Sequence, residues 1–153
     1  MSRVSASVAV EASLAEVWDY YFEPDGWPGW VDGFGRIESS DRYPEAGGVL
    51  HWVSGPAGRG KVTERVLEHE PRRLHRVAFE DPETAGELKV TFAIEGDGTV
   101  VTQEQDYRLQ SGGPFARLTD RLFIRSQMRG SLARSLGRLK LEVEEVASGS
   151  QPL

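Results

Sequence analysis

The sequence predicts an α+β fold in which a curved antiparallel sheet of about seven strands wraps around one long C-terminal helix. Two short helices are expected after the first strand, so the element order is β-α-α-β6-α. The chain opens with an alternating strand and a capped helix, and successive short alternating segments separated by turn residues fill its middle. Its last third changes to helical periodicity, and these three observations together predict the fold.

The first strand and first helix are marked by strong local signals. Residues 4–10 alternate apolar with small or polar side chains, which predicts a half-buried strand. Ser13 then precedes an apolar helical pattern, and Glu16 follows it at the spacing of a capping box. This helix is expected to run to about Phe22. The aromatic, breaker-rich segment 24–30 predicts a second short helix or an ordered loop.

The middle of the chain predicts an antiparallel sheet. Six strand-like segments lie at about residues 33–41, 47–54, 60–70, 73–80, 86–95 and 99–110. Turn residues separate them, and Gly96-Asp97-Gly98 between the last two is a strong hairpin signal. Short strands joined in sequence by tight turns pair as antiparallel neighbours.

The last third of the chain predicts a single long helix from Pro114 to about Val146. At about 1.5 Å per residue it would be roughly 50 Å long, so it must lie along the sheet. Residues 1–147 are therefore predicted to form one domain and residues 148–153 a flexible tail. A curved sheet against one helix leaves space between them, which predicts a ligand cavity.

Composition argues against several classes of protein. The 153 residues are 39% hydrophobic and 27% charged, as expected for one globular domain. A net charge of −6 argues against a nucleic-acid partner. The absence of cysteine excludes disulfides, thiolate catalysis and Cys-based zinc sites. The three histidines suggest no ligand set, so neither a metal nor a cofactor is expected.

The sequence also predicts where the protein resides. No stretch approaches the roughly 20 apolar residues that span a bilayer. The first ten residues contain no long apolar run of the kind found in signal peptides. A cytoplasmic location without a transmembrane segment is therefore expected.

Three local features resemble the helix-grip family of START domains, plant Bet v 1-type proteins and bacterial polyketide cyclase/dehydrase-like proteins. They are the strand, cap and Trp-bearing helix of Val8–Trp18, the Trp27-Pro28-Gly29-Trp30 element, and the last-helix segment from Ser131 to Glu142. The resemblance covers about residues 3–146 and implies this fold with a small-molecule cavity. The family includes enzymes, lipid carriers and hormone receptors, and no residue set here matches a cyclase's catalytic positions.

Two glutamines lie on the apolar face of the last predicted strand. Gln103 and Gln105 share that face with Val101, Tyr107 and Leu109, whereas the opposite face is polar. Buried polar groups are costly unless they are satisfied. The glutamines are therefore predicted to hydrogen-bond a ligand or its water. Alternatively, they satisfy each other or the backbone, or they lie on a wet rim.

Two titratable residues lie on inward faces of other predicted strands. Glu64 falls on an apolar face of the strand at 60–70, where it is predicted to be a carboxylate that points inward. Alternatively, it pairs with an arginine, or the strand has a different register in which Arg65 points inward. His75 shares a face with Val77 and Phe79. In one interpretation His75 serves as an acid or base near neutral pH. In the other it is an ordinary edge or surface histidine.

Arg125 and Arg129 interrupt the apolar stripe of the long helix. At 100° per residue the stripe comprises Leu118, Leu122, Leu132, Leu136 and Leu139. Beside it runs a row of small residues, Ser126, Gly130, Ala133 and Gly137. In one interpretation the arginines hold an anionic or phenolic group and the small residues make room for the ligand.

Three alternatives for these arginines remain open. In the first, the helix is broken near residue 124. In the second, the arginines extend their charged ends to solvent along the apolar surface or pair with Glu64. The third is a plain basic row that binds a partner or a membrane surface, made of Arg117, Arg121, Arg125 and Arg129.

Aromatic residues complete the candidate site. Each is a candidate for core packing, but as a set they suit a flat or aromatic ligand: Trp30, Trp52, Phe79, Phe92, Tyr107 and Phe123. The sequence therefore predicts that a monomer or homodimer binds a small hydrophobic or amphipathic molecule, which is aromatic, polyketide-like or lipid-like.

Two other functions remain open at this point. One is an enzyme of the polyketide cyclase/dehydratase type, in which His75, Glu64, Tyr107 or an arginine moves protons in the same cavity. The other is an interaction module that uses the basic row of the long helix and has no ligand.

Overall fold

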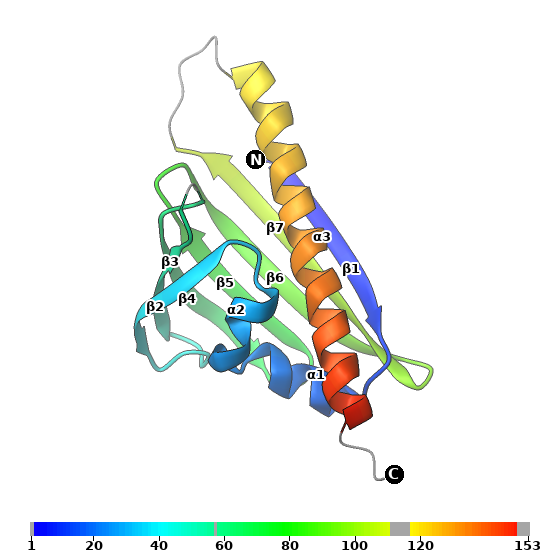
Figure 1. The fold of residues 1–153 in the computed structure, drawn as a ribbon. Helices are drawn as coiled ribbons and strands as arrows, with labels where there is room; N and C mark the ends of the chain where they lie inside the picture. The colour runs from blue at the N-terminus through cyan, green and yellow to red at the C-terminus, as the bar shows by residue number, and fades with distance from the viewer. Residues whose placement is uncertain (1, 57, 111–116, 150–153) are drawn as a thin grey trace.

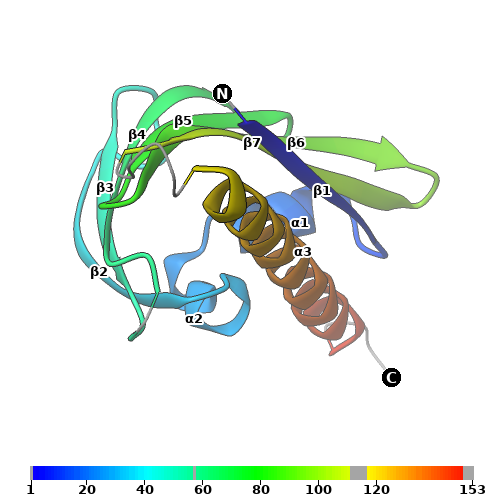
Figure 2. The same cartoon turned by 90° about the horizontal axis from the view of Figure 1, so that it is seen from above.

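The predicted sheet is confirmed in a computed structural model, which describes residues 2–56, 58–110 and 117–149, with side chains described from residue 121 in the last segment. Seven strands form one antiparallel sheet in the order β1-β7-β6-β5-β4-β3-β2. Their bounds are β1 Ser2–Val10, β2 Phe34–Asp41, β3 Val49–Ser54, β4 Lys61–Glu70, β5 Leu74–Glu80, β6 Thr84–Glu95 and β7 Gly98–Leu109. The sheet is strongly curved (Figure 2).

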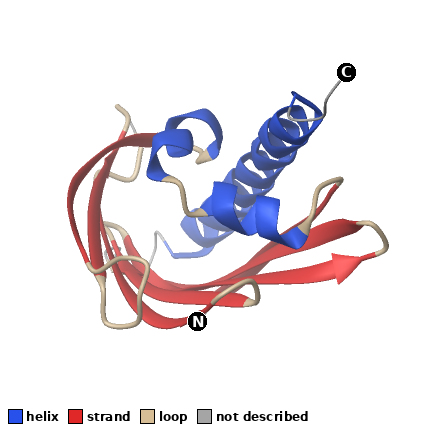
Figure 3. Cartoon of the chain, turned by 90° about the horizontal axis from the view of Figure 1, so that it is seen from below, coloured by secondary structure: helices blue, strands red, loops and turns tan. Residues whose placement is uncertain are grey.

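The helices lie on the concave side of this sheet (Figure 3). They are α1 (Leu14–Tyr21), the short 3-10 helix η1 (Pro24–Gly26), α2 (Trp27–Trp30) and α3 (Arg117–Gly149). The predicted start of the long helix at Pro114 lies outside the described residues. Because α3 is continuous past residue 124 (Figure 1), the alternative of a break there is wrong.

The capping box predicted before α1 is present. The Ser13 hydroxyl accepts from the Glu16 backbone N–H at 3.2 Å, and the Ser13 N–H donates to the Glu16 carboxylate at 3.3 Å. The cap sets where α1 begins, and so places Val17, Trp18 and Tyr21 on its buried face. Tyr21 is thereby directed toward the interior between the sheet and α3.

The long helix packs mainly on β1 and on the short helices. Its buried side chains Leu132, Leu136, Leu139 and Val143 join residues of the sheet and of α1 and α2 in the core. The Tyr20 hydroxyl donates to the Glu142 carboxylate, which ties α1 to α3. The C-terminal half of α3 is thus held against both layers, and the cavity described below lies beside it.

Two glycines have opposite surroundings, and alanine substitutions should therefore have opposite effects. A Cβ at Gly137 in α3 would have no neighbour within 4 Å, so Gly137→Ala should stabilise the fold by up to about 1 kcal/mol through helix propensity. A Cβ at Gly86 in β6 would lie 1.9 Å from the Asp106 carbonyl oxygen of β7. Gly86→Ala should cost about 2 kcal/mol. Urea unfolding measures both values, and a loss of stability in Gly137→Ala would contradict the account of α3.

Candidate ligand-binding cavity

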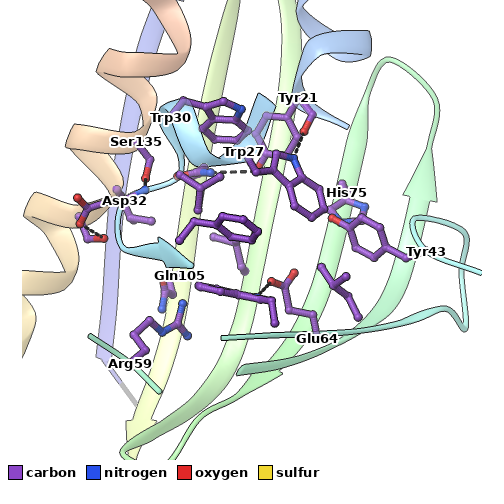
Figure 4. Close-up of a pocket in the computed structure, with 18 residues that line it drawn as sticks. Tyr21, Trp27, Trp30, Asp32, Tyr43, Arg59, Glu64, His75, Gln105 and Ser135 are labelled. Carbon is purple, nitrogen blue, oxygen red and sulfur yellow. Dashed lines mark hydrogen bonds between the residues drawn. The ribbon is translucent and has the colours of Figure 1, made fainter. Parts of the chain in front are cut away.

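A cavity of about 130 Å³ lies between the concave face of the sheet and helices α2 and α3. Its walls include aromatic and aliphatic side chains as well as several polar groups (Figure 4). Half of the predicted site residues line it: Trp30, Trp52, Glu64, His75, Gln103 and Gln105.

Gln103 lines the cavity and is almost fully buried. The period of β7 places Gln103 and Gln105 on its buried face, as the sequence predicts, and Gln103 is only 4% exposed. Its Nε2 donates to the Tyr21 hydroxyl at 2.9 Å. Its Oε1 has no hydrogen-bond partner among the described residues. An amide buried in this way favours a ligand that donates a hydrogen bond.

Trp30 also lines the cavity and is almost fully buried. In α2 the two tryptophans differ, because the Trp27 Nε1–H donates to the Tyr21 carbonyl oxygen at 2.9 Å. The Trp30 Nε1 has no partner in the described parts of the chain, although the residue is only 2% exposed.

Glu64 points into the cavity from β4 (Figure 4). The alternative register is wrong, because Arg65 is exposed while Val62 and Val66 are buried. The Trp52 Nε1–H donates to the Glu64 carboxylate at 2.7 Å. Burial raises the pKa of Glu64, and the Trp52 hydrogen bond and the Arg59 charge only partly offset it.

His75 is buried and links the cavity wall to the outer end of β4. Its Nε2 lies 3.4 Å from the Tyr43 hydroxyl, and its Nδ1 lies 3.0 Å from the Nδ1 of His69. Burial lowers the pKa of His75 to about 3, and neighbouring His69 contributes. His75 is therefore neutral at physiological pH, and the surface-histidine alternative is wrong because the residue is only 2% exposed.

Asp32 fastens the segment after α2 to α3 at the edge of the cavity. Its backbone N–H donates to the Ser135 hydroxyl at 2.8 Å, and its carboxylate accepts from the Ser131 hydroxyl at 2.9 Å. Arg134 donates two hydrogen bonds to it, and Arg138 donates one. Partial burial opposes the charge of Asp32, but these hydrogen bonds lower its pKa. We call Asp32 with these four partners the α2–α3 latch.

The predicted placement of Arg125, Arg129 and Phe123 is wrong. All three side chains are exposed, and none lines the cavity. In this part of α3 the side chains that face the core are those of Ile124 and Met128, each one residue before Arg125 and Arg129. The cavity is instead lined from α3 by Ser131, Leu132 and Ser135.

The apolar stripe and the small row of α3 also need correction. Leu122 is 69% exposed, and Ile124 and Met128 pack on the core in its place, while the side chain of Leu118 lies outside the described residues. Gly137 belongs to the small row but meets no bulky group, and Ser126 and Ala133 are exposed. The small residues therefore make no room for a ligand.

Three predicted aromatic residues are buried in the core and do not line the cavity. Phe92 packs on Trp18 and Tyr21, with ring centroids 4.8 and 5.3 Å apart. Phe79 and Tyr107 belong to a second core cluster with Val4 and Leu132. These are the core-packing roles that the sequence left open.

Several cavity residues were missed by sequence reasoning. Tyr21, Asp32, Tyr43 and Arg59 line the cavity, but Asp32, Tyr43 and Arg59 lie in connections where no periodicity assigns a face. Tyr21 could have been found, because it lies three residues after Trp18 on the same helix face. Arg59 pairs with Asp81 at 2.9 Å, a contact between distant connections.

No group of three or more His, Asp or Glu side chains among the described residues is arranged to hold a metal ion. None of the described helices combines the length and apolar character needed to cross a membrane.

Comparison with solved structures shows the same fold in proteins of low sequence identity. The Zhui aromatase/cyclase from Streptomyces sp. R1128 is 15% identical, with a TM-score of 0.75 and coverage of 99% of each chain. A protein from Thermus thermophilus is 21% identical, with a TM-score of 0.72, and 98% of this chain and 100% of that chain are covered. Norcoclaurine synthase from Thalictrum flavum is 13% identical, with a TM-score of 0.66 over 96% and 86% of the two chains.

Comparison with curated protein sequences finds no match. A family model does match, over residues 1–144, which is nearly the whole chain and includes every cavity-lining residue named above. Its description is polyketide cyclase/dehydrase and lipid transport. The chain therefore belongs to the polyketide cyclase/dehydrase and lipid transport family.

Proposed function

We propose that this protein binds a small amphipathic molecule in the cavity between the sheet and α3. One observation carries the proposal: Gln103 and Trp30 both line the cavity, and the Gln103 amide oxygen and the Trp30 indole N–H are buried without a partner among the described residues. A buried polar group without a partner costs about 1–3 kcal/mol. A ligand that pairs with both groups recovers that cost on binding.

The test is calorimetric titration with two small probes, toluene and p-cresol, together with a variant that fills the cavity. Val31 lines the cavity at the end of α2. Val31→Phe should weaken binding of whichever probe binds about tenfold or more. The control is Ile94→Phe, because Ile94 is 70% exposed in β6 and lies outside the cavity. Failure of both probes to bind, or equal binding by Val31→Phe, would contradict the proposal.

A second candidate function is supported by the titratable groups of the cavity. Glu64, His75 and Tyr43 line it together, and burial raises the pKa values of Glu64 and Tyr43. A carboxyl group that holds its proton more tightly in a partly apolar site is suited to general acid catalysis. This arrangement favours an enzyme of the cyclase/dehydratase type. In that case Glu64→Gln should abolish turnover of a polyketone substrate while substrate binding remains.

A further inference from the structure

Three neighbouring side chains form a polar subsite within the cavity, which we define as Tyr21, Trp30 and Gln103. The rings of Tyr21 and Trp30 lie 4.8 Å apart, and the Tyr21 hydroxyl accepts from Gln103. Two atoms of the subsite are buried without a partner among the described residues, the acceptor Gln103 Oε1 and the donor Trp30 Nε1–H. A hydroxyl group satisfies both, since its hydrogen is donated while its oxygen accepts. An ammonium group cannot serve Trp30, because it has no lone pair to accept a hydrogen bond.

The charges around the cavity disfavour an acidic ligand. The Glu64 carboxyl lines the cavity and receives a neutral N–H from Trp52. The cation on the lining, Arg59, is already paired with the buried carboxylate of Asp81 at 2.9 Å. Arg125 and Arg129 are exposed and off the lining. Among the described lining residues, an incoming carboxylate therefore finds no arginine or lysine without a carboxylate partner.

The size of the cavity suits a ligand portion of about one ring. Its volume of about 130 Å³ is close to that of an engineered apolar cavity of about 150 Å³ that binds benzene. Aromatic side chains supply much of the wall, including Trp27, Phe34 and Trp52. Such walls suit the flat face of a single aromatic ring.

We propose that the cavity selects a neutral, single-ring molecule that carries a hydroxyl group, and that it discriminates against carboxylic acids of similar size. The hydroxyl donates to Gln103 Oε1 and accepts from Trp30 Nε1–H, while the ring lies against the aromatic wall. This inference rests on the proposed function, because it names the class of ligand for the same cavity.

The experiment compares three probes that share one ring and differ in polar group: p-cresol, toluene and 4-methylbenzoate, titrated at pH 7 by calorimetry. Each hydrogen bond to a neutral partner is worth about 1 kcal/mol. Two such bonds should make p-cresol bind about tenfold or more tightly than toluene. The carboxylate should bind more weakly than toluene.

Two variants locate the selectivity. Gln103→Leu keeps the side-chain size and removes the amide, and Trp30→Phe keeps an aromatic ring and removes the indole N–H. In each variant the preference for p-cresol over toluene should fall severalfold, while toluene still binds. The ratio of the affinities for p-cresol and toluene within one variant is informative even if that variant is less stable. The same ratio in the wild-type protein is a test that needs no variant.

The outcomes separate this inference from the function on which it rests. Equal affinities for p-cresol and toluene in the wild-type protein, or tightest binding of 4-methylbenzoate, would overturn the ligand class but leave the cavity as a binding site. An unchanged preference in both variants would overturn the roles of Gln103 and Trp30. If no probe binds, the proposed function fails and this inference fails with it.

Discussion

Acidification from pH 7 to pH 4 should destabilise the folded protein by about 3 kcal/mol through His75 alone. The pKa of His75 is about 3 in the folded protein, against 6.5 for a free histidine, because the ring is buried beside Phe22, Tyr43 and His69. Between these two pKa values the unfolded chain binds a proton that the folded chain does not. Unfolding therefore takes up a proton, and stability falls as the pH falls below about 6.5.

The measurement is urea unfolding at pH 7 and pH 4 for wild type and His75→Leu. The variant should lose about 3 kcal/mol less than wild type over this interval. Val77→Ala is the matched control, because Val77 is the next inward residue of β5 and is fully buried. It should lower stability by a similar amount at both pH values. If wild type and His75→Leu lose the same stability on acidification, His75 is not buried in its neutral form.

Asp32→Ala should cost about 2 kcal/mol of stability and speed ligand release. The substitution removes the carboxylate that joins Ser131, Arg134 and Arg138 of α3 to the segment after α2. Hydrogen bonds to charged groups contribute about 1.5–3 kcal/mol each when buried, but both arginines are about half exposed, so solvent reduces the total. Because Asp32 lines the cavity, loosening the α2–α3 latch should open this part of the wall and so speed ligand release.

A similar ion pair elsewhere serves as the control. Asp106 accepts two hydrogen bonds from Arg3 on the opposite face of the sheet, away from the cavity lining. Asp106→Ala should cost less than 1 kcal/mol and should leave the dissociation rate of p-cresol unchanged. Stopped-flow fluorescence measures that rate. Equal effects of the two substitutions on the rate would show that the latch does not control access.

The fold was predictable because its signals are local. The Ser13–Glu16 capping box, the alternation in β1 and the hairpin glycines at Gly96 and Gly98 each depend on a few neighbouring residues. The same alternation placed Gln103 and Gln105 on the buried face of β7. Period two assigns a face wherever a strand is regular, so the inward glutamines could be identified without a structure.

The rest of the site depends on contacts that no short pattern reveals. Tyr43 and Asp32 follow β2 and α2 in connections, where the backbone has no repeating direction. Arg125 and Arg129 do fall near the angular position of Leu132 around the helix axis. Helical periodicity predicts the direction of a side chain, but it does not show whether another element packs over that side chain. In these turns of α3, Ile124 and Met128 pack on the core instead, and Arg125 and Arg129 are exposed.

We propose that a small molecule enters the cavity and pairs with its unsatisfied polar groups. The most direct test is the ¹H–¹⁵N spectrum of the four tryptophan indoles during titration with p-cresol, with the Trp30 signal assigned from Trp30→Phe. The Trp27 and Trp52 indoles already have partners, so their signals should move little, whereas the Trp30 proton should move downfield as it gains an acceptor. If p-cresol binds and the Trp30 signal does not move, the ligand lies elsewhere and the claim is contradicted.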